Sequence, residues 1–315
     1  MSRLQKFIID NSIIIAVVGA TALALTIPSP GQFLNSFNLT PFLIITVFFC
    51  QGTGVKRIKS DQLKDYGKIL TIGFITSQLL APIFAYFCAK SFGWTGDSFV
   101  GFMLICSMAP TLVSGTIISE QAGGNRTASL ILTIILNLVA VFTVPIILSI
   151  SLGAEVDIAV IPLLLKLVCL VLIPAIIGHF FRQKKEEFIT TNKNFFKYLP
   201  IFCLSAVIYI SMSKQVETIM QLTFTMLVEY SLGSLIVHAS LLYITFYTAI
   251  KYKADLASAK STAICCSQKT IPITIAIWTS EFSNYPLALL PAIVFHMCQI
   301  YFDGIIAKRW SRSSS

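Results

Sequence analysis

Charged residues are scarce in this chain: they make up 12% of its 315 residues, while hydrophobic residues make up 56%. A typical soluble domain has about 25% charged residues, because its surface must face water. The composition therefore excludes a soluble fold. The apolar residues come in runs of roughly the 20 residues that one helix needs to cross a hydrocarbon core, where only helices satisfy the backbone in this pattern.

Residues that carry enzyme chemistry are also few. The chain has three histidines, and we find no paired catalytic carboxylates, no metal-ligand spacing of histidine and cysteine, and no nucleophile beside a base. Its eight cysteines lie in or at the edge of apolar runs, where we expect them to pack as small hydrophobic side chains. We therefore expect a protein that is not an enzyme and has no organic cofactor.

The net charge of +9 does not indicate a nucleic-acid partner, because lysine and arginine occur in short clusters between the apolar runs. The clusters fall at every second turn: Arg3 and Lys6, residues 56–64, Arg126, residues 182–197, residues 251–260 and residues 308–312. By the positive-inside rule, they place both termini of a multi-pass plasma-membrane protein (inner-membrane, if bacterial) in the cytoplasm.

We predict an all-α polytopic fold of ten spans. They cover residues 11–28, 40–55, 67–89, 98–121, 126–152, 157–181, 196–213, 226–250, 257–280 and 286–307. We interpret the first run as a retained helix rather than a cleaved signal peptide. Spans four and nine are interrupted. The spans divide into a first repeat, residues 1–152, and an inverted second repeat, residues 153–315. Paired broken helices in inverted repeats are typical of secondary transporters, whose binding site lies at the breaks.

The break in span four surrounds Pro110, which lacks a backbone donor and disfavours helix just before it. Gly115 loosens the next turn, and Thr111, Ser114 and Thr116 supply hydroxyls. Helix ends exposed at a break carry unpaired N–H and C=O groups that can bind ions. The alternative is a proline-kinked helix whose hydroxyls bond back to their own backbone.

The break in span nine reads Ser267-Gln268-Lys269-Thr270, just before Pro272. A lysine at bilayer depth costs roughly 3 kcal/mol to insert, and such residues are usually functional. Lys269 is too far from either end of its span to reach water by snorkelling. We expect its ammonium between the two breaks, with hydroxyls of Ser267 or Thr270 completing its hydrogen bonds. The alternative is a purely structural lysine that pairs with carbonyls at the break.

A polar stripe follows span five, where Ser129, Thr133 and Asn137 are four residues apart and share one helix face. We expect the stripe to face an ion or substrate cavity, or else to form a hydrogen-bonded seam between helices. Other polar positions in apolar spans are weaker signals, for which interhelical hydrogen bonds are the favoured interpretation: Gln78, His238, His296, Gln299 and Asp303.

These residues carry a family resemblance. The run from Pro110 to Thr116, the pair Gly124-Asn125, and Ser129 with Thr133 resemble the bile acid:sodium symporter superfamily, and Ser267-Gln268-Lys269-Thr270 resembles its SBF-like branch. The resemblance implies a core domain of spans three to five and eight to ten, and a panel domain of spans one, two, six and seven. By position, it implies sodium ligands at Thr116, Ser129, Thr133 and Gln268, with Gln78 near another.

The chain departs from the family pattern at the second sodium site. Well-studied sodium-dependent members have a glutamate where this chain has Ile264, and Lys269 adds a positive charge nearby. An ammonium repels a sodium ion at close range in a low dielectric. We therefore expect the second site to be lost and at most one sodium ion to bind.

The sequence predicts a secondary active transporter that moves an amphipathic organic anion or lipid-like substrate by alternating access. One alternative is a proton-coupled or uncoupled transporter with Lys269 in place of a sodium ion. Another is a non-transporting membrane regulator that binds a lipid or signalling partner. Membrane lipid is an expected partner. The predicted binding residues are Gln78, Thr111, Ser114, Gly115, Thr116, Ser129, Thr133, Asn137, Ser267, Gln268, Lys269, Thr270 and His296.

Overall fold

The computed structural model describes residues 12–54, 66–111, 113–153, 156, 158–214, 216–220, 223–282 and 284–312, and these residues form helices and turns without a strand. The basic clusters at Arg3 and Lys6 and at residues 56–64 lie outside the described residues. The chain divides into two compact units. The first comprises Met1–Lys56 and Lys166–Leu222, and the second comprises Arg57–Leu165 and Thr223–Ser315.

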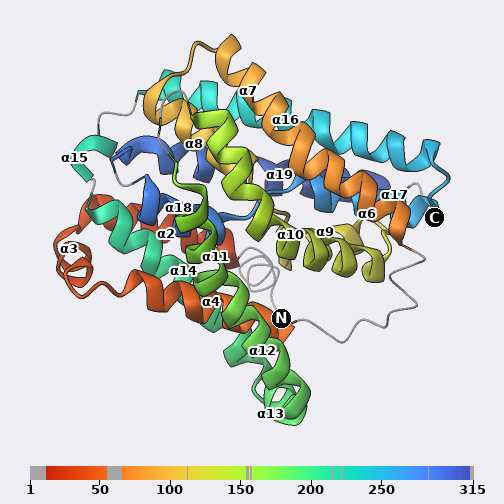
Figure 1. Ribbon diagram of the computed structural model, residues 1–315, viewed down its shortest axis with the longest axis horizontal. Helices are drawn as coiled ribbons and strands as arrows, with labels where there is room; N and C mark the ends of the chain where they lie inside the picture. The colour runs from red at the N-terminus through yellow and green to blue at the C-terminus, as the bar shows by residue number, and fades with distance from the viewer. Residues whose placement is uncertain are drawn as a thin grey trace. The chain divides into compact units, whose positions relative to one another are not determined.

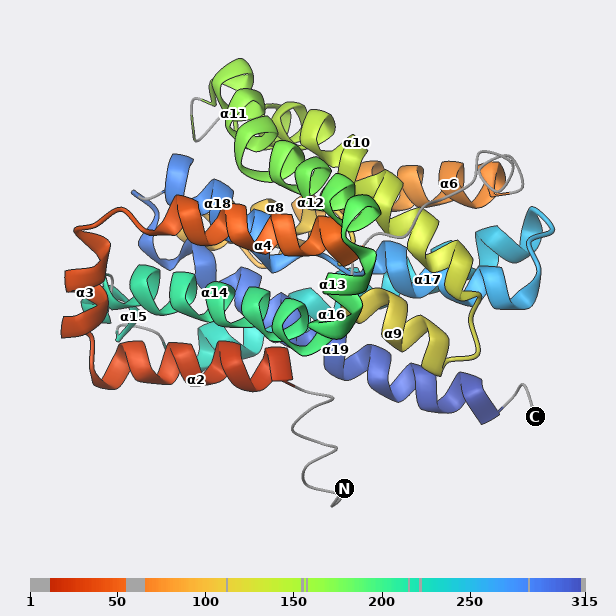
Figure 2. The same cartoon turned by 90° about the horizontal axis from the view of Figure 1, so that it is seen from below.

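The first unit is a set of apolar helices, in which α14 packs beside both α2 and α4 (Figure 2). Its elements are α2 (Ser12–Thr26), α3 (Ser29–Asn35), α4 (Thr40–Gly54), η2 (Val168–Leu172), α12 (Ile173–Lys184), α13 (Glu186–Thr191), α14 (Lys193–Ser213) and α15 (Val216–Ile219). Helix α3 occupies part of the predicted loop 29–39, because Pro30 in its first turn is preorganised for a helix start.

The second unit holds both broken helices, and α16 runs alongside α17 and α19 within it (Figure 1). Its elements are α6 (Gly67–Phe74), η1 (Ile75–Leu80), α7 (Ala81–Ser91), α8 (Gly96–Cys106), α9 (Val113–Gln121), α10 (Arg126–Leu152), α16 (Phe224–Lys251), α17 (Leu256–Ser267), α18 (Ile271–Glu281), η3 (Pro286–Ala288) and α19 (Leu289–Arg312). Helix α11 (Val160–Leu167) begins here and crosses the boundary between the units.

Local capping explains where two of these helices begin. The side chain of Asn125 accepts hydrogen bonds from the backbone N–H groups of Thr127 and Ala128 at the start of α10. The carboxylate of Asp255 accepts one from Ser258 at the start of α17. Each cap pairs backbone donors that have no partner within the helix.

The helices match the predicted spans to within a few residues, and the chain is a multi-pass membrane protein. Of the described helices, six are long and apolar enough to cross a membrane, or seven if α3 and α4, bent by 86°, count as one span. The six are Gly67–Ser91, Arg126–Leu152, Val160–Lys184, Lys193–Ser213, Phe224–Lys251 and Pro286–Ser311. The remaining predicted spans are short or broken helices, so the count of ten crossings stays a prediction.

Candidate functional site: two crossing helix breaks

The first break lies between α8 and α9 and leaves three successive backbone carbonyls without a helical donor. The carbonyls of Met108, Ala109 and Pro110 are instead bound by groups from distant parts of the chain, because buried carbonyls need partners. The donors are, in that order, Nζ of Lys269 at 3.0 Å, the backbone N–H of Thr270 at 3.0 Å and Nδ2 of Asn137 at 2.8 Å. Two of these donors belong to the second break, so the two breaks cross in direct contact.

The second break lies between α17 and α18, and side chains of two other helices satisfy its backbone. Nδ1 of His238, on α16, lies 3.1 Å from the carbonyl oxygen of Ser267. The amide of Gln299, on α19, accepts from the N–H of Lys269 at 2.7 Å and donates to its carbonyl at 2.9 Å. Nδ1 of His296 accepts from Gln299 at 2.8 Å. The interhelical hydrogen bonds favoured for these positions are therefore present, and they support the break.

The side chain of Lys269 is fully buried, at 0% exposure. Its Nζ donates to the carbonyl of Ser77 at 2.6 Å, the hydroxyl of Ser77 at 3.1 Å and the carbonyl of Met108 at 3.0 Å. An ammonium has three N–H donors, and here each has an oxygen. The expectation that Ser267 or Thr270 would complete this set is wrong, because Ser77 takes that place and the Ser267 hydroxyl donates to Ile264.

The carbonyl of Ser77 is available because of a local change in helix type. Residues Ile75–Leu80 form a π-helical turn, and the N–H of Ala81 donates five residues back to Thr76. The residue that would reach Ser77 in the same pattern is Pro82, which has no N–H. The Ser77 carbonyl thus lacks a donor in its own helix, and Lys269 supplies one. Such π-turns are frequent at functional sites.

Gln78, the next residue, is fully buried. Its Oε1 accepts from the hydroxyl of Thr143 at 2.8 Å. Its Nε2 has no hydrogen-bond partner among the described residues. A buried unpaired amide donor is costly, by about 1–3 kcal/mol, and it marks a position where a ligand group can bind.

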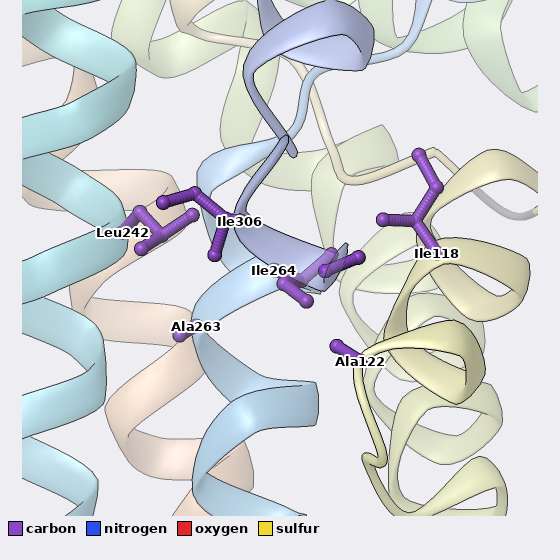
Figure 3. Packing of buried hydrophobic residues seen from close by; sticks show 7 residues of the cluster. Ile118, Ala122, Leu242, Ala263, Ile264 and Ile306 are labelled. Carbon is purple, nitrogen blue, oxygen red and sulfur yellow. The ribbon is translucent and has the colours of Figure 1, made fainter. Parts of the chain in front are cut away.

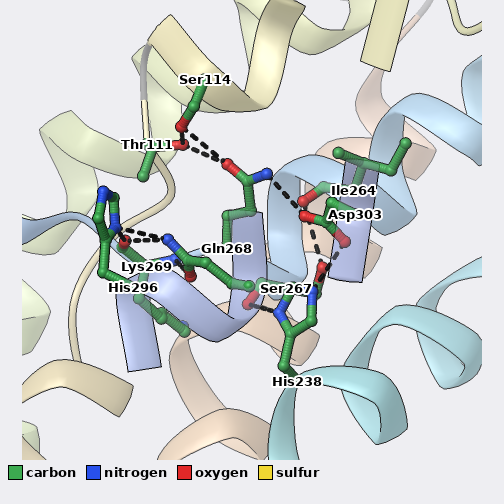
Figure 4. A network of polar contacts seen from close by, with 10 residues as sticks. Thr111, Ser114, His238, Ile264, Ser267, Gln268, Lys269, His296 and Asp303 are labelled. Carbon is green, nitrogen blue, oxygen red and sulfur yellow. Dashed lines mark hydrogen bonds and ion pairs between the residues drawn. The ribbon is translucent and has the colours of Figure 1, made fainter. Parts of the chain in front are cut away.

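Gln268 joins the first break to a buried acid–imidazole pair (Figure 4). Its Oε1 accepts from the hydroxyls of Thr111 at 2.5 Å and Ser114 at 3.1 Å. Its Nε2 donates to Oδ2 of Asp303 at 2.6 Å, and Oδ1 of Asp303 lies 2.8 Å from Nε2 of His238. Both lone pairs of the Gln268 amide oxygen are engaged, so we leave this residue out of the sodium site considered below.

The predicted polar stripe on α10 is divided by the structure. Asn137 reaches the first break, but the hydroxyl of Ser129 donates to the carbonyl of Arg126 and that of Thr133 to the carbonyl of Ser129, both at 2.9 Å within their own helix. Ser129 and Thr133 are fully buried, and Thr116 is half-buried on α9. Gly115 is in the crossing, where its N–H donates to the Thr111 hydroxyl.

Ile264, which stands where the family pattern has a glutamate, is buried in an apolar cluster (Figure 3). It packs with residues of α9, α16 and α19: Ile118, Ala122, Leu242, Ala263, Ile306 and Ala307. A carboxylate at this position would be surrounded by hydrocarbon and strongly disfavoured. The apolar cluster fits the expectation that this part of the second sodium site is lost.

Two contributions were not assigned from the sequence. Ser77 was not considered, although the proline five residues after it signals an unpaired carbonyl in an apolar span. Asp303 was noted only as a polar residue of span ten, and no sequence pattern links it to His238 or Gln268. These pairs are 65 and 35 residues apart in the chain, so only the packing of the helices reveals them.

The fold and site thus define a multi-pass membrane protein in which two broken helices cross around a buried lysine. The chain belongs to the SBF-like CPA transporter family, whose model matches residues 11–312. This is a family of transporters, and it agrees with the superfamily and branch that the sequence resembles.

Named relatives are similar over nearly the whole chain. A protein of Arabidopsis thaliana named probable sodium/metabolite cotransporter BASS4, chloroplastic, is 25% identical over 98% of this chain and 74% of its own length. The putative symporter YfeH of Escherichia coli K12 is 20% identical over 99% of this chain and 96% of its own. Sodium/bile acid cotransporter 7 of Xenopus tropicalis is 22% identical over 99% and 95%, respectively.

Proposed function

We propose that this protein is a secondary active transporter for an amphipathic organic anion. The observation that carries the proposal is the fully buried ammonium of Lys269, bound only by neutral oxygens where the two helix breaks cross. A fixed buried cation favours a negatively charged ligand nearby, and the unpaired amide of Gln78 can donate to such a ligand. Relatives named for sodium/metabolite and bile acid cotransport support the substrate class.

The proposed architecture is an inverted five-plus-five repeat of residues 1–152 and 153–315 that works by alternating access. A panel of spans one, two, six and seven and a core of spans three to five and eight to ten are proposed within it. The composition of the two compact units supports this assignment. Both termini would be cytoplasmic, so thiol labelling of single cysteines at Ser36 and Glu187 should report opposite sides of the membrane. Labelling from the same side would contradict the topology.

For coupling, we propose at most one sodium ion. Lys269 takes the place of a second, because its ammonium already occupies the oxygens of Ser77 and Met108. The residues proposed for one ion are Thr116, Ser129 and Thr133. The hydroxyls of Ser129 and Thr133 donate to carbonyls, which leaves their oxygen lone pairs for a cation. Sodium there would contribute a positive charge and bind more tightly in one conformation than in the other.

Uptake into proteoliposomes tests the transport function. The probe is radiolabelled taurocholate, a sulfonated bile acid that stays ionised, and the assay is counterflow, which needs no coupling ion gradient. Lys269→Met should abolish counterflow at every pH if Lys269 is a permanent cation. If Lys269 titrates, wild-type activity should depend on pH and that of the variant should not.

Lys260→Met is the matched control, because Lys260 is also buried on α17 but its Nζ donates to the carbonyl of Trp310. It should retain counterflow. Equal counterflow in wild type and Lys269→Met would overturn the role of the lysine. Specific binding of an anionic lipid without counterflow of any bile acid would favour a membrane regulator.

A further inference from the structure

The buried pair formed by His238 and Asp303 is not explained by binding of an organic anion. Both side chains are 0% exposed, and their facing atoms, Nε2 and Oδ1, are 2.8 Å apart. The rings of Phe295 and Phe302 flank the imidazole, with centroids 6.2 and 5.7 Å away. An acid and an imidazole held in such surroundings are expected to have a specific protonation state.

The hydrogen bonds fix how many protons the pair holds. The carbonyl of Ser267 can only accept, so Nδ1 of His238 must carry a hydrogen. The short bond between Nε2 and Oδ1 then needs a second hydrogen, either as imidazolium with carboxylate or as imidazole with carboxylic acid. In both descriptions the pair holds two protons and has no net charge.

Loss of one proton would break this arrangement. Nε2 and Oδ1 would face each other with lone pairs, which is repulsive in a low dielectric. Moving the remaining proton to Nε2 would restore that bond but leave a bare Nδ1 against the carbonyl of Ser267. Because Ser267 is the last residue of α17, either outcome weakens the contacts that hold the second break. Proton binding and the conformation of the break are therefore linked.

The other titratable groups nearby have different surroundings. From α17, the Cys265 thiol interacts electrostatically with Asp303, and Lys269 of the second break is bound by oxygens of η1 and the first break. On α19 itself, His296 bonds to Gln299. The carboxylates on neighbouring segments have their own partners: Glu229 with Trp94 of the α7–α8 loop, Glu120 of α9 with Arg126, and Asp97 of α8 with the N–H of Leu287.

We propose that His238 and Asp303 form a proton-binding site, and that one proton accompanies each molecule of organic anion. Proton uptake changes the charge of the pair from −1 to 0. With the ammonium of Lys269, the crossing then changes from neutral to +1, which favours an anion, and the loaded crossing is neutral again. The transport step rests on the proposed function, whereas proton binding by the pair does not.

Stability across pH tests proton binding without a substrate. An unfolded chain holds one proton on these two groups above the histidine value of about 6.5, whereas the folded pair holds two. Wild-type stability in choline chloride should thus fall as pH rises above about 6.5, by close to tenfold in the folding equilibrium constant per pH unit. Asp303→Asn cannot release a proton, and its amide can donate to His238 and accept from Gln268, so this contribution should vanish.

Ser234→Ala is the control, because Ser234 is buried one turn before His238 and donates to Tyr230 of its own helix. It should keep the wild-type pH profile. If Asp303→Asn does not fold, the double variant His238→Gln/Asp303→Asn, in which one amide donates to the other, takes its place. A wild-type profile without this slope, or the same slope in the variants, would overturn the proton site.

A pH gradient tests the coupling. With acid outside, wild-type proteoliposomes should accumulate taurocholate above its external concentration, and Asp303→Asn should show counterflow without accumulation. Accumulation by Asp303→Asn, or wild-type counterflow that a pH gradient does not drive, would overturn proton coupling. Absence of wild-type counterflow would instead contradict the proposed transport of bile acids, while the stability profiles would still decide the proton site.

Discussion

In the first unit, the closest helix contacts are between backbones. A Cβ atom added at Gly52 would lie 2.0 Å from the carbonyl oxygen of Ala175, and one at Gly178 would lie 2.1 Å from that of Phe49, so α4 and α12 approach each other through two glycines. In the second unit, polar groups are buried instead. Among the described residues, every buried charged or histidine side chain belongs to this unit: His238, Lys260, Lys269, His296 and Asp303.

The difference shows two ways of joining helices in a membrane. Small residues allow close van der Waals packing where lipid gives no hydrophobic drive, and this is how α4 and α12 meet. The second unit also has such a contact, at Gly101, but its breaks need hydrogen-bond partners that only polar side chains supply. We therefore expect the first unit to respond mainly to added volume and the second mainly to lost polar groups.

The largest effect is expected for Gly52→Ala. Its methyl group would meet a backbone oxygen that cannot rotate away, and overpacking of this kind costs about 3 kcal/mol. The free energy of unfolding in an SDS titration measures the change. Gly54→Ala, on the same helix with open space around the new atom, should not destabilise the protein. Equal effects of the two substitutions would mean that α4 and α12 are not closely packed.

A smaller loss, about 2–3 kcal/mol, is expected for Gln268→Leu. The substitution leaves Oδ2 of Asp303 without its donor, while the hydroxyls of Thr111 and Ser114, 2.7 Å apart, can still pair with each other. Gln32→Leu is the comparison in the first unit, where an exposed glutamine donates to the carbonyl of Ser213, and it should change stability by less than about 1 kcal/mol. A larger effect at Gln32 would reverse the contrast between the units.

Asn125→Ala should destabilise the protein by about 1 kcal/mol, because it removes the cap of α10. Asn125→Asp keeps an oxygen that accepts from Thr127 and Ala128, so it should recover most of the loss. Thermal unfolding of both variants measures this. If Asn125→Asp is as unstable as Asn125→Ala, the contacts of Nδ2 with Tyr66 and Ser258 matter more than the cap.

The smallest change in stability is expected for Ser129→Ala/Thr133→Ala. These hydroxyls bond only within their own helix, so the loss should stay below about 1 kcal/mol. The informative measurement is the difference between melting temperatures in sodium and in choline, because an ion that binds the folded state stabilises it. This difference should disappear in the double variant and persist in Ser151→Ala, a back-bonded serine on the same helix. A sodium effect that survives in the double variant would place the ion elsewhere.

The positions of the helices and of both breaks follow from local properties of the chain. Helices α10 and α16 are long apolar runs with capping residues before them, and both signals can be read within one segment. The breaks occur near Pro110 and Pro272, where proline and adjacent polar residues interrupt an apolar run. The resemblance to the family likewise depended on residues close together in the chain.

The partners of the break were not predictable in the same way. Lys269 could be placed at membrane depth from the sequence, but its contacts with Ser77 and Met108 join residues 192 and 161 positions apart. Nothing local distinguishes the hydroxyl of Ser77, which binds the ammonium, from that of Ser267, which bonds to its own helix. Ser129 and Thr133 share a face with Asn137, yet only Asn137 reaches the first break.

The sequence by itself determined that this is a membrane protein of apolar helices, where two of them break, and that a lysine lies at one break, because hydropathy and proline act on the adjacent backbone. Only the tertiary structure decided that the breaks cross, that Ser77 and Met108 hold the ammonium, and that Asp303 pairs with His238. The physical reason is that a buried polar group must find a partner, but any helix that packs against it can supply one.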